Sequence, residues 1–206
     1  MSLSQELWGS HRELAHRCLE HPFVQGIASG QLPLDRFRFY VEQDAYFLDA
    51  FARAYALLLA KVPDRQGFLE LKKLFDGAVD ELRLHRSYAE RWGVNLQPAP
   101  APATRAYTDF LLRVAALEPP GHGLAAQAPC MRLYAYLGSE LRAYLRPESP
   151  YAEWVHTYAS EDFHRLAQTL EHLLDRYGGD PRRIRELYGR AMELEYEFFD
   201  AAWRSG

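Results

Sequence analysis

The chain is poor in cysteine and in long apolar runs. It has only two cysteines among 206 residues, Cys18 and Cys130, which are too few for a disulfide scaffold. A reducing compartment, the cytoplasm, is the simplest location for such a chain. No stretch is long and apolar enough to cross a membrane, and the N-terminus lacks the apolar segment of a signal peptide. We therefore expect no membrane partner.

Excess positive charge is also missing. The 24 basic residues are outnumbered by 28 acidic ones, so the formal net charge is −4. Proteins that bind nucleic acid usually gather Lys and Arg on one face. This chain has no basic stripe and no recognisable DNA-reading helix. Its composition therefore argues against a nucleic-acid partner and against a role in transcriptional regulation.

Strand patterns are absent as well, and helical periodicity runs through most of the chain. The expected helices cover 3–20, 34–61, a run from Asp64 to Trp92, and then 104–117, 124–145, 151–177 and 182–203. Gly93 is suited to a helix C-terminus and Thr104 to an N-cap. Neither of the connectors 96–103 and 118–123 divides the chain into self-sufficient halves. We therefore predict one all-α domain, a helical bundle over residues 1–206.

One of the two cysteines lies in a pattern that suggests chemistry. Tyr134 follows Cys130 by four residues, so the thiol and the phenol share one helical face. Pro129 fits the first turn of a helix, which would put Cys130 near a positive helix N-terminus and favour the thiolate. A free thiol placed in this way is a candidate nucleophile. The alternative is a small apolar residue of the core, which is the commoner role of a buried cysteine.

An acidic residue interrupts an aromatic stripe near the start of the second expected helix. Phe37, Tyr40, Asp44 and Phe47 are spaced three or four residues apart and fall on one face. Asp44 either reaches solvent at the edge of the stripe or faces inward with the aromatic side chains. The spacing alone leaves both possibilities open.

Several segments together resemble the TenA/thiaminase II family, in the order that the family uses. They are Leu7-Trp8, His21-Pro22-Phe23, Gly30 to Pro33, Phe39 to Leu48, His85, Trp92-Gly93, Ala106 to Phe110, Pro129-Cys130, Tyr134, Gly138, Trp154 to Ser160, Phe163 and Glu195 to Phe199. The resemblance implies the haem-oxygenase-like fold, an all-α bundle with the site buried inside it. It also implies a homotetramer, a small pyrimidine as substrate and no cofactor.

The implied reaction is a hydrolysis at an aminopyrimidine. A cysteine adds to the ring, a group leaves from the methylene at ring position 5, and water replaces it. The leaving group is ammonia from aminomethyl-aminopyrimidine, or the thiazole from thiamine, and the product in both cases is hydroxymethylpyrimidine. The family therefore suggests an enzyme of thiamine salvage.

The resemblance assigns a role to each matching residue. Cys130 falls at the position of the nucleophile, and Glu195 at that of the acid that contacts a ring nitrogen and shuttles protons. Asp44 falls at the position that binds the amidine-like edge of the pyrimidine. The ring-stacking or hydrogen-bonding positions fall on Tyr107, Tyr134 and Tyr158. Phe47 stands where many members have a tyrosine whose hydroxyl reaches the cysteine, so it can stack on the substrate but cannot donate that hydrogen bond.

These residue types suit the reaction on chemical grounds. Thiolate is the best side-chain nucleophile for a reluctant ring carbon. A carboxylic acid with a raised pKa can protonate the ring nitrogen as charge builds there, and burial among aromatic residues raises a carboxyl pKa. Glu195 has aromatic neighbours at 196, 198 and 199. Since Glu193, Glu195 and Glu197 alternate along a helix, they cannot all face inward.

Two other functions remain open from the sequence. A haem-oxygenase-like di-iron oxidase would use pairs such as Glu161 with His164 or Glu81 with His85, which have usable ligand spacings on a helix. The other is a pyrimidine-binding protein whose catalysis is weakened. This alternative is open because Phe47 cannot donate a hydrogen bond to the cysteine. No metal site is expected if the cysteine chemistry is correct.

Overall fold

The computed structural model describes residues 1–205, apart from the side chains of Arg83 and Leu84. Within this range the chain forms ten α-helices and no strand. They are α1 (Leu3–Ser10), α2 (Arg12–Leu19), α3 (Pro22–Ser29), α4 (Leu34–Leu59), α5 (Arg65–Trp92), α6 (Pro102–Leu117), α7 (Pro120–Arg142), α8 (Ala152–Tyr158), α9 (Glu161–Tyr177) and α10 (Pro181–Trp203). The predicted all-α bundle is confirmed.

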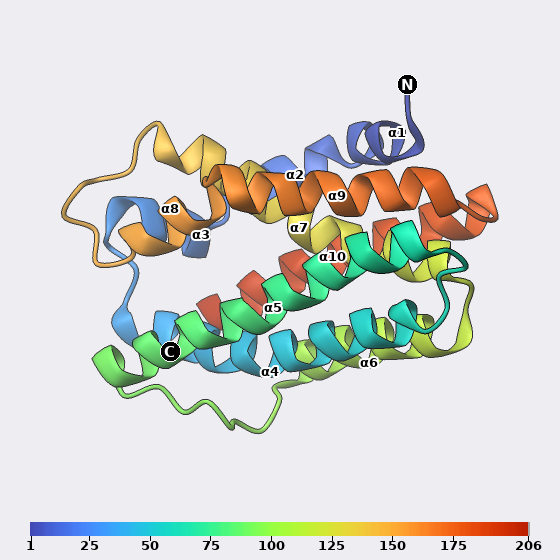
Figure 1. Cartoon of the computed structure of the whole chain (residues 1–206). Helices are drawn as coiled ribbons and strands as arrows, with labels where there is room; N and C mark the ends of the chain where they lie inside the picture. The colour runs from blue at the N-terminus through green and yellow to red at the C-terminus, as the bar shows by residue number, and fades with distance from the viewer. Residues whose placement is uncertain (206) are drawn as a thin grey trace.

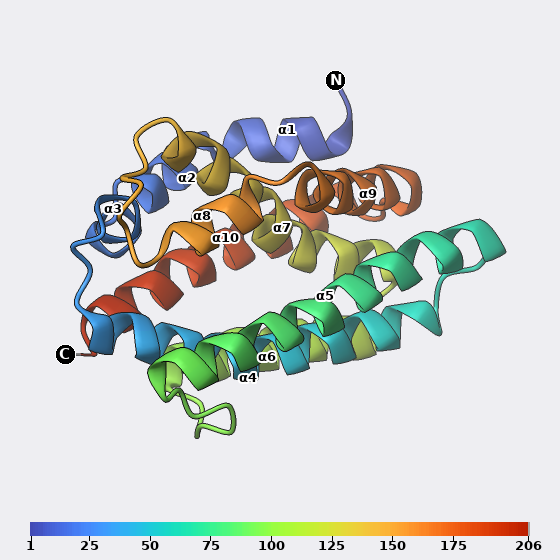
Figure 2. The same ribbon diagram turned by 60° about the vertical axis from the view of Figure 1, so that its left-hand side comes forward.

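The long helices pack as a layered bundle. Helices α4, α5 and α6 run side by side on one side of the molecule, and α1, α2 and α9 lie on the other (Figures 1 and 2). Helices α7 and α10 pack against each other between these groups, and α7 also contacts α4, α6, α8 and α9. Any polar side chain on the inner faces of α4, α7 and α10 is therefore held in the centre of the bundle.

Several helix boundaries agree with the local signals. Gly93 ends α5 in the left-handed conformation at φ 64°, and its N–H donates to the Ala89 carbonyl. Asp64 begins the same helix by accepting from the Gly67 N–H. Asp180 caps α10 in the same way, with Pro181 in the first turn.

Two expected helices are each divided into two. The segment 3–20 is interrupted at His11, which ends α1 through bonds to the Gly9 and Trp8 carbonyls. The segment 151–177 breaks after α8, where the Ser160 hydroxyl accepts from the Phe163 N–H and starts α9. A helical period continues across both breaks because the flanking apolar residues all face the same core.

The start of α6 also differs from the prediction. Ala101 is the N-cap, with Pro102 in the first turn, so Thr104 lies inside the helix. The Thr104 hydroxyl donates instead to Gln43 on α4, at 2.7 Å. The Thr104 side chain therefore forms a tertiary hydrogen bond instead of the N-cap that local spacing predicts.

Helix α7 begins earlier than expected and passes straight through Pro129. Residues 120–123, which we expected in a loop, form its first turn, and Gly121 lies against the Gly178 carbonyl so closely that a Cβ would sit 1.7 Å from that oxygen. Pro129 is therefore inside the helix, where the missing N–H costs about 3 kcal/mol. The prediction that Cys130 lies near a helix N-terminus is wrong.

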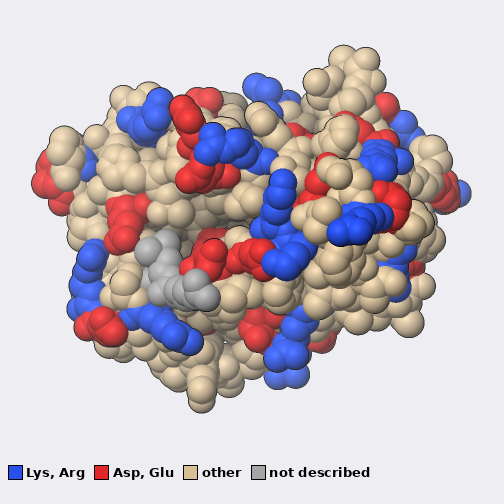
Figure 3. Space-filling model, in the orientation of Figure 1, with Lys and Arg blue, Asp and Glu red and all other residues tan. Residues whose placement is uncertain are grey.

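The surface agrees with the charge composition. On the face of Figure 3, acidic and basic side chains are interspersed, and no broad basic area appears. Among the described residues, no helix has the length and apolar character needed to cross a membrane.

Candidate active site

A narrow enclosed cavity lies where α4, α5, α7, α8 and α9 meet. Its lining consists of Asp44, Phe47, Leu48, Phe51, Glu81, Cys130, Met131, Tyr134, Tyr158 and Phe163. Its volume is about 10 Å³, the space of roughly one water molecule. Five of the seven predicted site residues, Asp44, Phe47, Cys130, Tyr134 and Tyr158, are therefore brought together around one space. We call this space the inner cavity.

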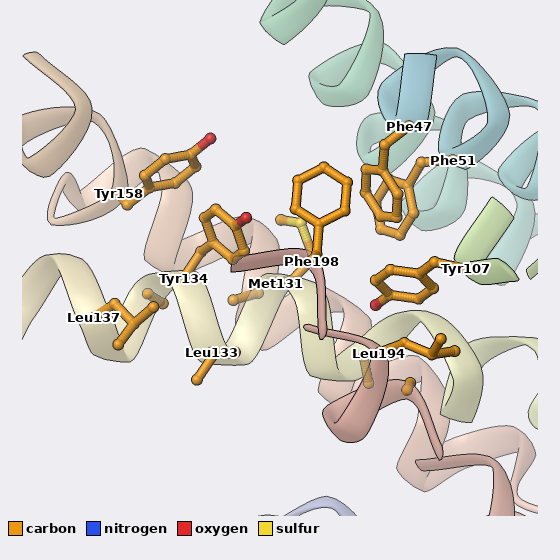
Figure 4. Close-up of a cluster of buried hydrophobic side chains, with 14 of the residues drawn as sticks. Phe47, Phe51, Tyr107, Met131, Leu133, Tyr134, Leu137, Tyr158, Leu194 and Phe198 are labelled. Atoms are coloured by element: carbon orange, nitrogen blue, oxygen red, sulfur yellow. The ribbon is translucent and has the colours of Figure 1, made fainter. Parts of the chain in front are cut away.

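The other two predicted residues, Tyr107 and Glu195, lie beside Cys130 without lining the inner cavity. The Tyr107 hydroxyl donates to Glu195 Oε1 at 2.6 Å, and the Cys130 thiol donates a hydrogen bond to the same carboxyl group. Tyr107 also packs on Phe47, with ring centroids 4.8 Å apart. Figure 4 shows these aromatic rings, with those of Tyr134, Tyr158 and Phe198, projecting from different helices toward one region. Cys130 is thus held between the cavity and a carboxyl group.

The Cys130 thiol is held in its protonated form. Burial raises its pKa well above the ordinary value, and the negative charges of Glu195, Glu81 and Asp44 raise it further. The sequence pattern suggested the opposite, because it placed the thiol at a positive helix end. In the middle of α7 the backbone amides are already bonded within the helix, so they do not stabilise a thiolate.

Glu195 is a buried carboxyl group that holds a proton near neutral pH. Burial raises its pKa to about 8, the bonds from Tyr107 and Cys130 oppose that rise, and the charge of Asp44 adds to it. Its neighbours Glu193 and Glu197 turn outward and pair with Arg190, each at 2.9 Å. As expected, the three glutamates do not all face inward, and Glu195 is the one that is buried.

Asp44 also faces the interior, with 4% of its surface exposed. His85 on α5 lies opposite, and its Nε2 is 2.8 Å from Asp44 Oδ2. His85 Nδ1 lies 3.0 Å from the Glu81 carbonyl, which can only accept, so this nitrogen carries a proton. Burial lowers the pKa of His85, but the hydrogen bond and charge of Asp44 outweigh it, and the net pKa is raised. The imidazole therefore fixes the Asp44 carboxyl group.

Glu81 is a site residue that the sequence reasoning did not place there. It lines the inner cavity, and the Tyr158 hydroxyl donates to its Oε1 at 2.5 Å. Burial and the charge of Asp44 raise its pKa to about 7. The sequence holds a signal for this position, because Glu81 and His85 lie four residues apart on one helical face. The spacing suggests a pair of metal ligands, whereas in the fold His85 binds Asp44 and Glu81 binds Tyr158.

Contacts outside the inner cavity fix the two tyrosines that line it, Tyr134 and Tyr158. The Trp154 indole donates to the Tyr40 hydroxyl at 3.1 Å, and the Tyr40 and Tyr134 hydroxyls share a hydrogen bond of the same length. Tyr158 lies against Gly138 of α7, where a Cβ would come within 2.5 Å of the Tyr158 carbonyl carbon. These contacts hold both phenol rings in one orientation at the cavity wall.

The candidate metal ligands do not converge. Glu161 and His164 line a separate surface depression, in which Ser139 and His164 are hydrogen-bonded. Across the described part of the chain, no group of three or more His, Cys, Asp or Glu side chains could hold a metal ion. The arrangement gives no support to the di-iron oxidase.

The fold and the cavity define a class of protein: an all-α bundle that buries one thiol between carboxyl groups and aromatic rings. Residues 8–205 match the TENA/THI-4/PQQC family, and the chain belongs to that family. The predicted membership of the TenA/thiaminase II family is confirmed. A structure from Shewanella denitrificans described as having a heme oxygenase-like fold superposes with a TM-score of 0.77 at 14% identity, over 97% of this chain and 91% of that one.

Individual relatives agree with this assignment. Aminopyrimidine aminohydrolase of Halalkalibacterium halodurans is 32% identical over an alignment of 215 positions that covers 98% of this chain and 96% of that protein. The TenA homologue of P. horikoshii is 28% identical, with a TM-score of 0.92 and full coverage of both chains. The bifunctional TH2 protein of Arabidopsis thaliana is 33% identical over 97% of this chain, but the match spans only 37% of that longer protein.

Proposed function

We propose that the chain is a hydrolase of thiamine salvage that converts aminopyrimidines to hydroxymethylpyrimidine. The observation that supports this most is the Cys130–Glu195 hydrogen bond beside a cavity that Asp44 also lines. A nucleophile, a proton shuttle and an acceptor for an exocyclic amino group thus surround one aromatic space. Relatives of nearly the same length in three bacteria are named aminopyrimidine aminohydrolase, which agrees with this activity.

The raised pKa of the thiol sets the first step of the mechanism. The ionised form of Glu195 takes the thiol proton as sulfur attacks the ring carbon, so that free thiolate does not accumulate. The S–C bond forms, and the displaced electron pair moves to a ring nitrogen. Glu195 then delivers the same proton to that nitrogen.

The second half of the mechanism exchanges the substituent. The ring electrons return and expel the group on the methylene, which leaves with its bonding pair. Water adds to the methylene and releases one proton to solvent. The sulfur then departs from the ring with its bonding pair and regains, through Glu195, the proton that the ring nitrogen held. Asp44 accepts a hydrogen bond from the exocyclic amino group throughout and so fixes the ring in register.

The weakened binding protein has less support from the geometry. The reason to consider it is that Phe47 cannot hydrogen-bond the thiol. The thiol, however, is already hydrogen-bonded to Glu195. Phe47 instead forms an aromatic wall with Phe51, at 5.3 Å between ring centroids. The cytoplasmic location remains a prediction from the low cysteine content, and the homotetramer remains a prediction from the resemblance.

The direct test is turnover by the purified chain. Aminomethyl-aminopyrimidine should release ammonia and hydroxymethylpyrimidine in equal amounts, as measured by chromatography and an ammonia assay. Removal of metals with a chelator should leave the rate unchanged. A purified chain that hydrolyses neither aminomethyl-aminopyrimidine nor thiamine would overturn the proposal.

We expect His85→Leu to raise KM about tenfold or more while kcat falls much less. Loss of the imidazole leaves the Asp44 carboxyl group without its fixed donor, at a cost of about 1–3 kcal/mol that falls mainly on binding. His85→Gln, whose amide can still donate, should restore most of the affinity. Steady-state kinetics check both variants, and an equal loss of kcat in the two would contradict this positioning role.

A further inference from the structure

Three carboxyl groups lie near the reacting thiol, and two of them are already engaged. Glu195 accepts bonds from Tyr107 and the thiol, lies outside the described lining of the inner cavity, and must recover the proton held by the ring nitrogen. Asp44 is held by His85 at 2.8 Å and accepts from the exocyclic amino group. The third carboxyl group is that of Glu81, which lines the inner cavity itself. It has no part in the attack of sulfur or in holding the ring.

Glu81 lies between the inner cavity and the surface. It also lines a second space of about 380 Å³ in the groove between α5 and α9 (Figure 1). We call this second space the outer cavity. It reaches the surface, because the Asp162 side chain on its lining is 86% exposed. A proton taken up by Glu81 inside the bundle therefore has a way out to solvent.

The Glu81 carboxyl group is fixed in place and suited to exchanging a proton. The Tyr158 hydroxyl donates to its Oε1 at 2.5 Å, and the Tyr158 ring packs on Tyr134 and Phe163 with centroids 4.7 and 4.9 Å apart. A carboxylate has a second oxygen that can accept from water. Its pKa of about 7 means that both forms are populated near neutral pH. Such a group can take up a proton and release it again.

We propose that Glu81 is the base that activates the hydrolytic water. This inference rests on the proposed function, since the water attacks the methylene of a bound aminopyrimidine. The leaving group departs first with its bonding pair, as ammonia from an ammonium or as thiazole from a thiazolium. A lone pair of the water then forms the C–O bond, and the exocyclic double-bond pair returns to the ring. The Glu81 carboxylate takes one water proton during this step and releases it to solvent afterwards.

The test is Glu81→Gln, which separates the two halves of the reaction. The amide oxygen can still accept from Tyr158, so the wall of the inner cavity is kept, but the amide cannot take a proton. We expect kcat to fall about 10²-fold or more, with a smaller change in KM. Rapid-quench measurements should still show a first turnover that releases one leaving group per active site at nearly the wild-type rate. Only the later turnovers should be slow, since they wait for water.

Glu171→Gln is the matched control. Glu171 and Glu81 are both half-buried glutamates whose pKa is raised by burial. Glu171 pairs with Arg132 at 3.5 Å and lies outside the described lining of both cavities. Its variant should keep the wild-type rate in the first turnover and in the later ones.

Glu81→Ala with added azide is a second, independent test. The shortened side chain leaves room for a small anion, and azide has no proton to lose when its nitrogen bonds to the methylene. Azide should therefore restore release of the leaving group at least tenfold in this variant. The product should be the azidomethylpyrimidine, identified by chromatography and mass spectrometry. A purely structural role of Glu81 would give neither result.

The possible failures can be told apart. A folded Glu81→Gln protein that keeps the full rate, or that loses the first turnover together with the later ones, overturns this role of Glu81. So does an alanine variant that azide does not restore. The proposed function stands in each of these cases, because the wild type still hydrolyses its substrate. A wild type that hydrolyses neither substrate removes the proposed function, and the role of Glu81 with it.

Discussion

Cys130→Ser is expected to lower turnover of both substrates by about 10³-fold or more. A serine hydroxyl ionises far less readily than a thiol and is a weaker nucleophile toward a ring carbon. Glu195 is also poised by its hydrogen bond to accept a proton from sulfur at this position. Steady-state rates measured with high enzyme concentration would check the loss. A serine variant that keeps the full rate would show that Cys130 is not the nucleophile.

Cys18 is the matched control for that substitution. It is fully buried on α2, does not line either cavity, and burial raises its pKa to about 12. Cys18→Ser should leave the substrate KM unchanged and lower the melting temperature instead, because it places a hydroxyl in the core. Cys130→Ser should still bind hydroxymethylpyrimidine with nearly wild-type affinity in calorimetry. These two results would separate lost chemistry from lost structure.

Glu195→Gln should have opposite effects on activity and on stability. The amide cannot move a proton between sulfur and ring nitrogen, so kcat should fall about 10²–10⁴-fold, with a smaller change in binding. In the wild type the carboxyl group must be ionised to accept the thiol proton. We therefore expect kcat/KM to rise with pH through the Glu195 pKa of about 8. The glutamine variant should lose that dependence.

The stability effect follows from the same pKa. Folding raises the Glu195 pKa from its ordinary value of 4.5 to about 8, so the folded protein binds this proton more tightly than the unfolded chain. The corresponding stability is fully present below about pH 4.5 and is lost as pH rises through 8. At pH 9 the neutral amide should therefore stabilise the protein, by on the order of a few kcal/mol.

Thermal unfolding of the two proteins at pH 5 and pH 9 would check this prediction. The melting temperatures should be close at pH 5, where Glu195 is protonated and resembles the amide, and the variant should be higher at pH 9. Glu193→Gln, at the exposed neighbour that pairs with Arg190, should show neither the gain nor the loss of activity. Equal pH dependence in wild type and Glu195→Gln would mean that Glu195 does not hold a proton in the folded state.

These predictions describe a site that costs stability. Cys130 experiences the charges of Glu195, Glu81 and Asp44 together, and burial penalises the charged forms of Cys130, Glu195 and Glu81. The helix that holds the thiol also contains a proline in its interior. Buried ionisable groups and a proline inside a helix both lower the stability of a fold. They are expected at a site where a protein gives up stability for chemistry.

Much of the secondary structure could be predicted because its causes are local. Gly93 adopts a left-handed conformation and ends α5, and Asp64 caps its start, so adjacent residues determine both ends. The errors occurred where tertiary contacts overrode those rules. Gly121 packs against a distant carbonyl and α7 begins around it, so Pro129 is absorbed into the interior of the helix.

The sequence by itself determined the helical class, the family and five of the residues that line the inner cavity, Asp44, Phe47, Cys130, Tyr134 and Tyr158. Those properties depend on periodicity and on ordered motifs. Only the tertiary structure decided the state of the groups: the Tyr107–Glu195 bond joins residues 88 apart, and the His85–Asp44 bond joins residues 41 apart. Proton affinity depends on burial and on such distant charges. Local spacing therefore suggested a thiolate at Cys130, whereas the folded chain holds a protonated thiol beside the Glu195 carboxyl group.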